Sequence, residues 1–427
     1  MNGLRIVWVK IGGLWPLHTG GRLRSFHILS ELSRRHRVTV LTTHRPDEDP
    51  AALAACLPHC ERVVSFPHAA PKQGSRGFVG SLARSWLSPL PVDLWKSRVP
   101  SLRAEVDRLV AAGLVDVCVA DFLVAAPNVR LGGAMPVVLF EHNVEHMIWK
   151  RLAAIETRAW RRALLAVEWR KMRRAEARAC TQATVTIAVS DVDRALLAAG
   201  APGARVFTVP TGVDTSYFAP DGVPESPGRL VFIGSMDWYP NEDAMMFFIG
   251  EILPAVRRAV PDVELAVVGR DPSARLRAMG EAAGVRITGT VDDVRPWIAD
   301  AAVYVVPLRV GGGTRLKIFE GLAMGKAVVS TTVGAEGLPL VDGTHFVRAD
   351  APAEFARAVV SLLRAPARRR ALGRAGRQLV EARYSWATVA REFETRFEPA
   401  LGARMTAEAR PRVGRGLSSV SRPFSHR

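Results

Sequence analysis

Short runs of hydrophobic residues alternate, along most of the chain, with stretches in which hydrophobic residues recur every three or four positions. The short runs are typical of buried strands and the longer stretches of amphipathic helices, so the alternation indicates β-α-β units with a parallel sheet. One open, doubly wound sheet accounts for the first half of the chain. There we expect strands at 5–9, 38–42, 115–120, 137–140 and 184–189, with helices at 23–34 and 101–112.

The alternation stops at residues 209–228, where VPTGVDTSYFAPDGVPESPG is rich in Pro, Gly, Asp and Ser, and then resumes. Such a composition favours turns and indicates a boundary between domains. The simplest fold class is therefore α/β with two consecutive Rossmann-like domains. In the second we expect strands at 230–233, 264–268, 285–288, 303–306 and 327–330, and helices at 242–260, 273–283, 294–299 and 315–324.

Beyond residue 350 the pattern predicts only helices, at 353–363, 368–383 and 386–397. From residue 401 it dissolves into Arg, Gly, Ser and Pro, with six arginines against Glu408 as the single acidic residue, which is typical of a disordered basic tail. We expect a first domain over 1–208, a linker over 209–228, a second domain over 229–384, a C-terminal helix over 385–400 that can return to the first domain, and the tail over 401–427.

Composition agrees with a globular chain: 48% of the 427 residues are hydrophobic and 23% are charged. No run approaches the roughly 18 apolar residues of a membrane-spanning helix. The N-terminal MNGLRIVWVK enters a strand-like run directly, without the order of regions in a secretion signal, so we expect a cytoplasmic protein. The net charge of +17 favours anionic partners, although a general bias toward Arg weakens this argument.

The four cysteines show no paired C-x-x-C spacing, so a disulfide framework is not expected. Cys56, His59 and Cys60 could form half of a metal site. No second Cys/His cluster follows at zinc-finger spacing, and the segment also fits an Ala-rich helix. We therefore predict no metal site.

The most informative segment is VGGGTRLKIFEGLAMG at 310–325, which lies between two predicted strands and begins a helix. Its glycines allow positive φ and a close approach of backbone, and its threonine can cap the helix. Two cations in the first turn are repelled by the helix dipole, and a bound diphosphate would remove that penalty. The candidate diphosphate site comprises Gly311, Gly312, Gly313, Thr314, Arg315 and Lys317.

Glu320 lies one helical turn after Lys317 and allows two interpretations. It can form a surface ion pair with that lysine. It can also accept hydrogen bonds from two neighbouring hydroxyls of a ribose beside the phosphate site.

Four segments together resemble the retaining glycosyltransferases of the GT-B fold, namely glycosyl transferases group 1, also called family 4. They are GGGTRLKIFEGLAMGKAVVST, VFIGSMDWYPNEDA, VPTGVDTSYF and EHNVEH. The resemblance implies two Rossmann-like domains that face a central cleft, with the acceptor on the first and the nucleotide sugar on the second. It also implies that Arg315 and Lys317 bind the donor diphosphate and that Glu320 is the second glutamate of the E-x7-E signature, whose first position holds Gly312 here.

Further donor-binding residues are expected at the ends of strands. Gly234 and Ser235 follow the first strand of the second domain, where the family brings backbone near the phosphates; an ordinary βα turn is the alternative. By the same resemblance, the loop at Gly289 reads the nucleotide base. In the first domain, Gly20 and Gly21 begin a helix and can approach the donor or the acceptor.

EHNVEH follows the strand at 137–140, and polar residues at the carboxyl end of a parallel strand collect in a cleft. By position and by resemblance, His142 is the candidate to contact the transferred sugar, and a satisfied structural histidine is the alternative. We expect weaker contacts to the sugar or acceptor from Glu141, Asn143 and Glu145.

The predicted function is transfer of a sugar from a nucleotide-diphosphate donor to a glycan or lipid-linked acceptor, with retention and without a metal or other cofactor. The resemblance assigns catalysis to Arg315, Lys317 and His142, and lets the leaving diphosphate take the acceptor proton. A nucleotide-sugar epimerase of the same architecture is one alternative. A basic nucleic-acid-binding protein is another, but only 7% of the residues are aromatic, so we expect no nucleic-acid partner.

Residues 150–178 contain ten Lys or Arg against three Glu, interleaved with hydrophobic residues, and are predicted to form one long basic amphipathic helix. The helix can pack on the core with a solvated Arg face. It can also dock reversibly on an anionic membrane at the inner face of the plasma membrane.

Overall fold

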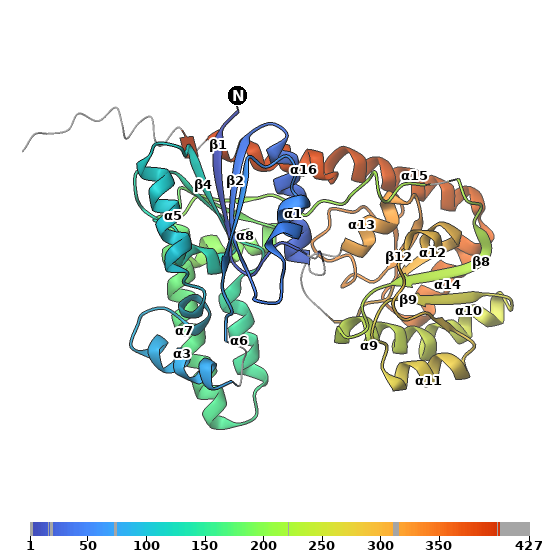
Figure 1. Ribbon diagram of the computed structural model, residues 1–427. Helices are drawn as coiled ribbons and strands as arrows, with labels where there is room; N and C mark the ends of the chain where they lie inside the picture. The colour runs from blue at the N-terminus through green and yellow to red at the C-terminus, as the bar shows by residue number, and fades with distance from the viewer. Residues whose placement is uncertain are drawn as a thin grey trace, which may run out of the picture.

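The computed structural model describes residues 3–15, 17, 20–71, 75–220, 222–310, 316–398 and 400–401. Within them the chain forms two α/β units, each built on its own parallel sheet, seen on the left and the right of Figure 1. The predicted α/β class with two Rossmann-like sheets is confirmed.

The first sheet contains seven strands among the described residues, all paired in parallel in the order β3-β2-β1-β4-β5-β6-β7. Its central strands are hydrophobic and buried throughout, as expected when helices cover both faces. The strands are β1 (Arg5–Lys10), β2 (Arg37–His44), β3 (Arg62–Pro67), β4 (Val117–Asp121), β5 (Val137–Phe140), β6 (Val185–Ala188) and β7 (Val206–Thr208). The helices are α1 (Gly20–Ser33), α2 (Pro50–Ala55), α3 (Arg76–Trp86), α4 (Val92–Lys96), α5 (Pro100–Ala111), η1 (Leu123–Asn128), α6 (Glu145–Ile155), α7 (Ala159–Gln182) and α8 (Asp191–Gly200).

The second sheet has six parallel strands in the described part of the chain, in the order β10-β9-β8-β11-β12-β13. The strands are β8 (Ser226–Ile233), β9 (Glu264–Val268), β10 (Arg286–Ile287), β11 (Ala301–Val306), β12 (Ala327–Ser330) and β13 (Val347–Arg348). The helices are α9 (Tyr239–Phe247), the π-helical turn η2 (Phe248–Ile252), α10 (Leu253–Ala259), α11 (Ala274–Ala282), α12 (Arg295–Asp300), α13 (Leu316–Ala323), α14 (Pro352–Arg364), α15 (Pro366–Arg383) and α16 (Trp386–Thr395).

Three strands were not predicted, and each lies at or beside a sheet edge. β3 is only partly buried, while β7 and β13 have three and two residues, too few for a hydrophobic period to be visible. The helix predicted at 242–260 is interrupted by η2, just before Pro254 in the first turn of α10. Proline cannot donate the helical N–H, which explains the local change in hydrogen bonding.

The prediction of one long helix over residues 150–178 is wrong. The chain forms α6 and α7, which pack against each other, and Glu156 at the end of α6 is extended at ψ 124°. Its carboxylate accepts a hydrogen bond from the backbone N–H of Arg158 at 2.9 Å. This side-chain-to-backbone turn, just before α7, competes with continuation of α6.

The last helix leaves the second sheet and packs in the first unit, where α16 lies along α1 (Figure 1). The ring of Phe393 lies 5.7 Å from that of Trp8 in the first core, and His27 stacks on Trp386 at 4.9 Å. The N–H of Val213 also donates to the Tyr384 carbonyl at 2.7 Å. The two segments that cross between the sheets therefore run side by side.

Candidate functional site

Three neighbouring strands of the first sheet end in polar residues that form one buried network. Lys10 ends β1, Asp121 ends β4 and His142 follows β5, and Lys10 is directly paired with Asp121 in the strand register. The Asp121 carboxylate accepts hydrogen bonds from Lys10 Nζ at 3.1 Å, from His142 Nε2 at 2.8 Å and from Trp8 Nε1 at 2.9 Å. Parallel strands bring their carboxyl ends to one edge, which is why residues far apart in sequence meet here.

Arg24 of α1 completes the network. Its Nη1 lies 2.8 Å from His142 Nδ1, and its Nε donates to Thr211 Oγ1, in the segment between the two sheets, at 2.9 Å. The Asp121 carboxylate can only accept, so His142 Nε2 must carry a proton, and the Arg24 guanidinium can only donate, so His142 Nδ1 must accept. His142 therefore fits the neutral tautomer with its proton on Nε2. Both ring nitrogens are thus engaged inside the protein.

The electrostatics of the network agree with this assignment. Burial lowers the pKa of His142 to about 3, so the ring is neutral at physiological pH. Burial alone would raise the pKa of Asp121, but the Lys10 ammonium and the His142 hydrogen bond outweigh burial and hold that pKa below its usual range. Burial also lowers the pKa of Arg24 to about 10, which leaves it cationic. Lys10 and Arg24 thus place two buried cations beside the Asp121 carboxylate, and Asp193 is the second carboxylate that interacts with Arg24.

Gly20 and Gly21 begin α1 beside this network. A side chain at Gly21 is excluded, since a Cβ there would lie 2.5 Å from Cζ of Phe122. The Phe122 ring stacks on His142, with ring centroids 3.7 Å apart. A Cβ on Gly20 would lie 3.8 Å from Cδ1 of Leu316, the first residue of α13 in the second unit. The start of α1 therefore faces the start of α13.

Lys317, in the first turn of α13, points toward the end of β8. Its Nζ donates to Asn241 Oδ1 at 2.5 Å and lies 4.2 Å from the centroid of the Phe232 ring. A Cβ on Gly234 would lie 2.7 Å from Lys317 Nζ. Only glycine lets the lysine approach the backbone at this point. The ammonium thus comes from the first turn of α13, where helix N–H groups have no partner within the helix, and both kinds of donor can bind phosphate oxygens.

The other residues predicted on the donor side surround this position. Ser235 accepts a hydrogen bond from Arg270 Nε at 2.7 Å, and Gly289 accepts one from the N–H of Gly269 at 3.2 Å. Burial raises the pKa of Glu320, one turn along α13, to about 7, although the Lys317 ammonium opposes this shift. The structure thus brings Lys317, Glu320 and the ends of β8 and β10 to one edge of the second sheet. The predicted residues Gly311, Gly312, Gly313, Thr314 and Arg315 lie outside the described residues.

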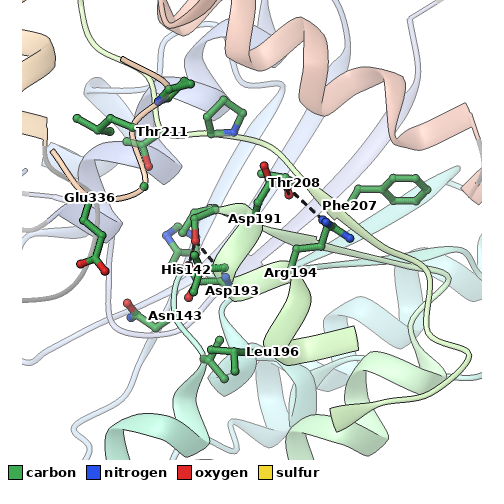
Figure 2. Close-up of a pocket in the computed structure, with 18 of the residues that line it drawn as sticks. His142, Asn143, Asp191, Asp193, Arg194, Leu196, Phe207, Thr208, Thr211 and Glu336 are labelled. Atoms are coloured by element: carbon green, nitrogen blue, oxygen red, sulfur yellow. Dashed lines mark hydrogen bonds and ion pairs between the residues drawn. The ribbon is translucent and has the colours of Figure 1, made fainter. Parts of the chain in front are cut away.

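A cavity of about 1240 Å³, here called the cleft cavity, lies between the two units next to His142. Figure 2 shows His142 and Asn143 on one side of the cavity and Glu336, from the loop after β12, on the other. Asp191 and Arg194 of α8 line the wall further along. Apolar lining comes from Val144, Met147, Ile148, Leu196, Phe207, Leu338 and Pro339, among others.

Glu141 and Glu145 do not line the cleft cavity within the described part of the chain. They lie near the buried Glu176, whose carboxylate accepts hydrogen bonds from the Glu145 N–H at 2.6 Å and from His146. Burial, together with the nearby carboxyls of Glu176 and Glu145, raises the pKa of Glu141 well above its usual range. Glu176, through the Glu145 N–H and His146, therefore supports the segment that follows His142 and Asn143.

Sequence reasoning missed Asp121, Lys10, Arg24 and Asn241. Lys10 and Asp121 carried a usable signal, since each is the polar residue that ends a buried strand, as in EHNVEH. Arg24 gave no such signal, because an arginine within an amphipathic helix normally faces solvent. Its partners Thr211 and His142 are 187 and 118 residues away.

The described residues also bear on metal binding and on membrane spanning. Among them, no group of three or more His, Cys, Asp or Glu side chains could hold a metal ion. No helix in the described ranges is both long and apolar enough to cross a membrane.

Comparison with known proteins identifies both units. The family described as "Glycosyltransferase Family 4" matches residues 20–217, and that described as "Glycosyl transferases group 1" matches residues 227–365. A phosphatidyl-myo-inositol mannosyltransferase of Mycobacterium tuberculosis is 32% identical over 231 residues, which is 51% of this chain and 60% of that protein. The match thus spans less than two thirds of that relative.

Two further similarities cover more of the chain. A GDP-mannose-dependent alpha-(1-6)-phosphatidylinositol monomannoside mannosyltransferase of Mycolicibacterium smegmatis is 28% identical over 353 residues, or 73% of this chain and 90% of that protein. The structure of sucrose-phosphate synthase from Thermosynechococcus elongatus superimposes with a TM-score of 0.65 at 17% identity, covering 93% of this chain and 99% of that one. At that identity the superposition supports the fold alone. By its two matched segments and its fold, the chain belongs to the GT-B glycosyltransferases of group 1, family 4.

Proposed function

We propose that this protein transfers a sugar, with retention of configuration and without a metal ion, from a nucleotide-diphosphate donor to a lipid-borne acceptor. The observation that carries the proposal is the position of Lys317 at the start of α13. Its ammonium lies beside Gly234, and the same end of α13 faces Gly20 of the first unit. A donor diphosphate placed there would meet the ammonium, the free helix N–H groups and the backbone of both units.

The chemistry that this arrangement supports is displacement of the diphosphate. The bond between the sugar C1 and the phosphate oxygen breaks, and the acceptor oxygen bonds to C1 on the same face. The acceptor proton passes to the leaving diphosphate. Negative charge grows on the β-phosphate in the transition state, so Lys317 stabilises the transition state more than the ground state. Arg315 remains the predicted second cation.

The buried network supports His142 as a positioning group in this reaction. With Nδ1 and Nε2 held by Arg24 and Asp121, the ring fixes the loop that lines the cleft cavity, and Asn143 presents its exposed side chain there. The positive charge of Lys10 and Arg24 below that loop favours an anionic donor in the cleft.

The relatives narrow the substrates that we propose. Their names specify GDP-mannose as a donor and phosphatidylinositol or its monomannoside as acceptors. The cleft cavity suits such an amphipathic acceptor, since it combines an apolar wall that includes Met147 and Ile148 with charged residues such as Arg151 and Arg194. We therefore propose a mannosyl donor and an inositol-containing lipid as the first pair to test.

We further propose that the α6–α7 pair docks reversibly on an anionic membrane, as a lipid acceptor would require. Leu152 on α6 and Trp160 on α7 are 43% and 61% exposed, among arginines on the same helices. Trp86 of α3, 48% exposed, lies against α7 through its hydrogen bond to Glu168 at 3.1 Å. Exposed aromatic and aliphatic side chains beside cations are typical of surfaces that enter the headgroup region.

The donor site is tested by Lys317→Ala, with Lys96→Ala as the matched control. Lys96 pairs with Asp93 in the first unit, at 2.5 Å, and has no part in the proposed site. We expect kcat/KM to fall about 100-fold or more in the first variant and less than about twofold in the control. Turnover that is unchanged in a normally folded Lys317→Ala protein would contradict the proposal.

Two further measurements separate the reaction types. Chromatography of donor incubated with enzyme but without acceptor should show no new nucleotide sugar, whereas an epimerase would convert the donor alone. Activity should persist in EDTA, because the charge is neutralised by side chains and helix N–H groups.

A further inference from the structure

A second cavity lies on the opposite edge of the second sheet from Lys317 and Gly234. It has a volume of about 590 Å³ and is here called the amino-edge cavity, because its lining includes Pro227 at the start of β8 and Lys326 just before β12. Most of the eight-residue β8 separates it from Gly234, which corresponds to roughly 20 Å at about 3.3 Å per residue. It is thus a separate place from the donor site.

The amino-edge cavity is strongly cationic. Among its described lining residues there are five cationic side chains and one carboxylate, that of Glu225. Asp221, which lies next to this segment in sequence, is outside the described residues. The charged lining residues are Glu225, Lys326, Arg369, Arg370, Arg374 and Arg377.

Three of these cations have structural partners. Lys326 and Arg369 are only 5% and 4% exposed, and they share Glu225 at 3.3 Å and 3.2 Å. Lys326 also donates to the Ala299 carbonyl at 2.5 Å, and Arg369 donates to the last carbonyls of α14. Arg377 donates to the Ala323 carbonyl at the end of α13 and pairs with Glu381 at 2.6 Å. Lys326 and Arg369 are therefore buried cations of the cavity lining that are held in fixed positions, and Arg377 is partly buried beside them.

The remaining two cations of the cavity lining, Arg370 and Arg374, differ from these three. They lie one turn apart on α15, both exposed, and neither has a hydrogen-bond or ion-pair partner in the described ranges. Like charges four residues apart on a helix repel each other. The two buried cations share the Glu225 carboxylate, and Asp300 also interacts with Lys326, so the nearby carboxyls are already engaged by Lys326 and Arg369. Guanidinium groups are suited to binding phosphate oxygens in pairs.

We propose that the amino-edge cavity is a second anion site, which binds the phosphate groups of a small phosphorylated molecule between Arg370 and Arg374. The volume lies within the range of small-ligand sites. A cavity of this size lined by five cationic side chains fits a compact phosphorylated molecule. This site is independent of the transfer reaction proposed above, and nothing in that reaction requires it.

The test is calorimetric titration of inorganic pyrophosphate, at low salt, into the full-length protein and three variants. We expect two binding events in the unmodified protein, one at each edge of the second sheet. Arg370→Ser with Arg374→Ser should weaken one event at least about tenfold and leave sugar transfer unchanged. Lys317→Ala should weaken the other event instead.

The matched control is Arg357→Ser with Arg368→Ser, which removes two exposed arginines of the same domain that do not line the cavity. If this control lowers affinity as much as the Arg370/Arg374 variant, or if that variant binds like the unmodified protein, the proposal is overturned. A single event that disappears in Lys317→Ala also overturns it, without affecting the transferase assignment.

Sedimentation with phosphatidylcholine vesicles that contain phosphatidic acid distinguishes a soluble from a lipid-borne phosphate. Pyrophosphate binding that depends on Arg370 and Arg374, with vesicle binding that does not, supports the soluble ligand. If vesicle binding depends on these arginines and pyrophosphate binding does not, the phosphate belongs to a lipid and the small-molecule assignment is overturned.

Discussion

Replacing Asp121 by asparagine should remove most of the support for the polar network under the cleft. Asp121 is 0% exposed and accepts hydrogen bonds from Trp8, Lys10 and His142. Asparagine keeps the shape and one acceptor oxygen but removes the charge. Lys10, only 3% exposed, would then be a buried cation without its counter-ion.

The cost can be bounded from this geometry. Breaking a buried ion pair by removing one partner typically costs about 3–5 kcal/mol, because the remaining charge stays desolvated. Domains of this kind have total stabilities of about 5–15 kcal/mol, so the variant should remain folded at 25 °C with a much smaller margin. Lys10→Met added to Asp121→Asn removes the stranded cation and should recover about half of the loss or more.

Urea unfolding followed by circular dichroism at pH 7 measures these differences. Asp116→Asn is the matched control, since Asp116 pairs with Arg5 at 2.5 Å but both side chains are partly exposed, and it should cost about 1 kcal/mol or less. The pKa of Asp121 is depressed in the folded protein, so its contribution is present above the usual aspartate pKa and is lost as the pH falls. A loss below about 1 kcal/mol in Asp121→Asn at pH 7 would refute this reasoning.

Three other outcomes are expected. Gly21→Ala should destabilise the folded protein by about 1–3 kcal/mol, because the new Cβ would lie 2.5 Å from the Phe122 ring. Adding Phe122→Leu to this variant should recover part of the loss. If the effects of the two substitutions are additive in a double-mutant cycle, this contact is not the cause. Glu320→Gln should stabilise the protein by up to about 3 kcal/mol at pH 8. The raised pKa of about 7 makes the native state bind its proton more tightly than the unfolded chain, so wild-type stability falls as the pH rises from the usual glutamate pKa to 7. The Glu320→Gln gain should therefore vanish near pH 4 in urea unfolding, and an equal gain at both pH values would contradict the assignment. Anionic liposomes should sediment the protein weakly at low salt and not at 1 M salt, where the Debye length is ~3 Å, and Trp160→Ser should reduce pelleting; no pelleting at low salt would leave the arginines as a solvated face.

The sequence by itself determined the architecture of both units. Buried strands such as β5 and β11 are continuous hydrophobic runs, and amphipathic helices separate them, so the type of each element and its order along the chain could be read directly. The predicted domain boundary rests on the Pro- and Gly-rich segment at 209–228, which separates the two series of alternating strands and helices. The failures were the short or partly buried edge strands β3, β7 and β13 and the break between α6 and α7 at Glu156, which depends on local hydrogen bonding.

The sequence also located the candidate site, because a glycine-rich turn with cations and polar residues after buried strands are local patterns. Lys317, Gly234 and His142 were found in this way. Local patterns do not show what a side chain contacts, and the engagement of both His142 nitrogens depends on Asp121 and Arg24, 21 and 118 residues away.

Tertiary structure alone decided how the two edges of the second sheet differ. Lys317 follows a glycine-rich turn that marks it in the sequence, whereas Arg370 lies in an arginine-rich helix whose sequence does not show which edge of the sheet it faces. The fold places one at the carboxyl ends of the strands, facing the first unit, and the other at the amino ends, on the cavity with Lys326 and Arg369. The direction of parallel strands, which no single segment encodes, makes these two edges chemically distinct.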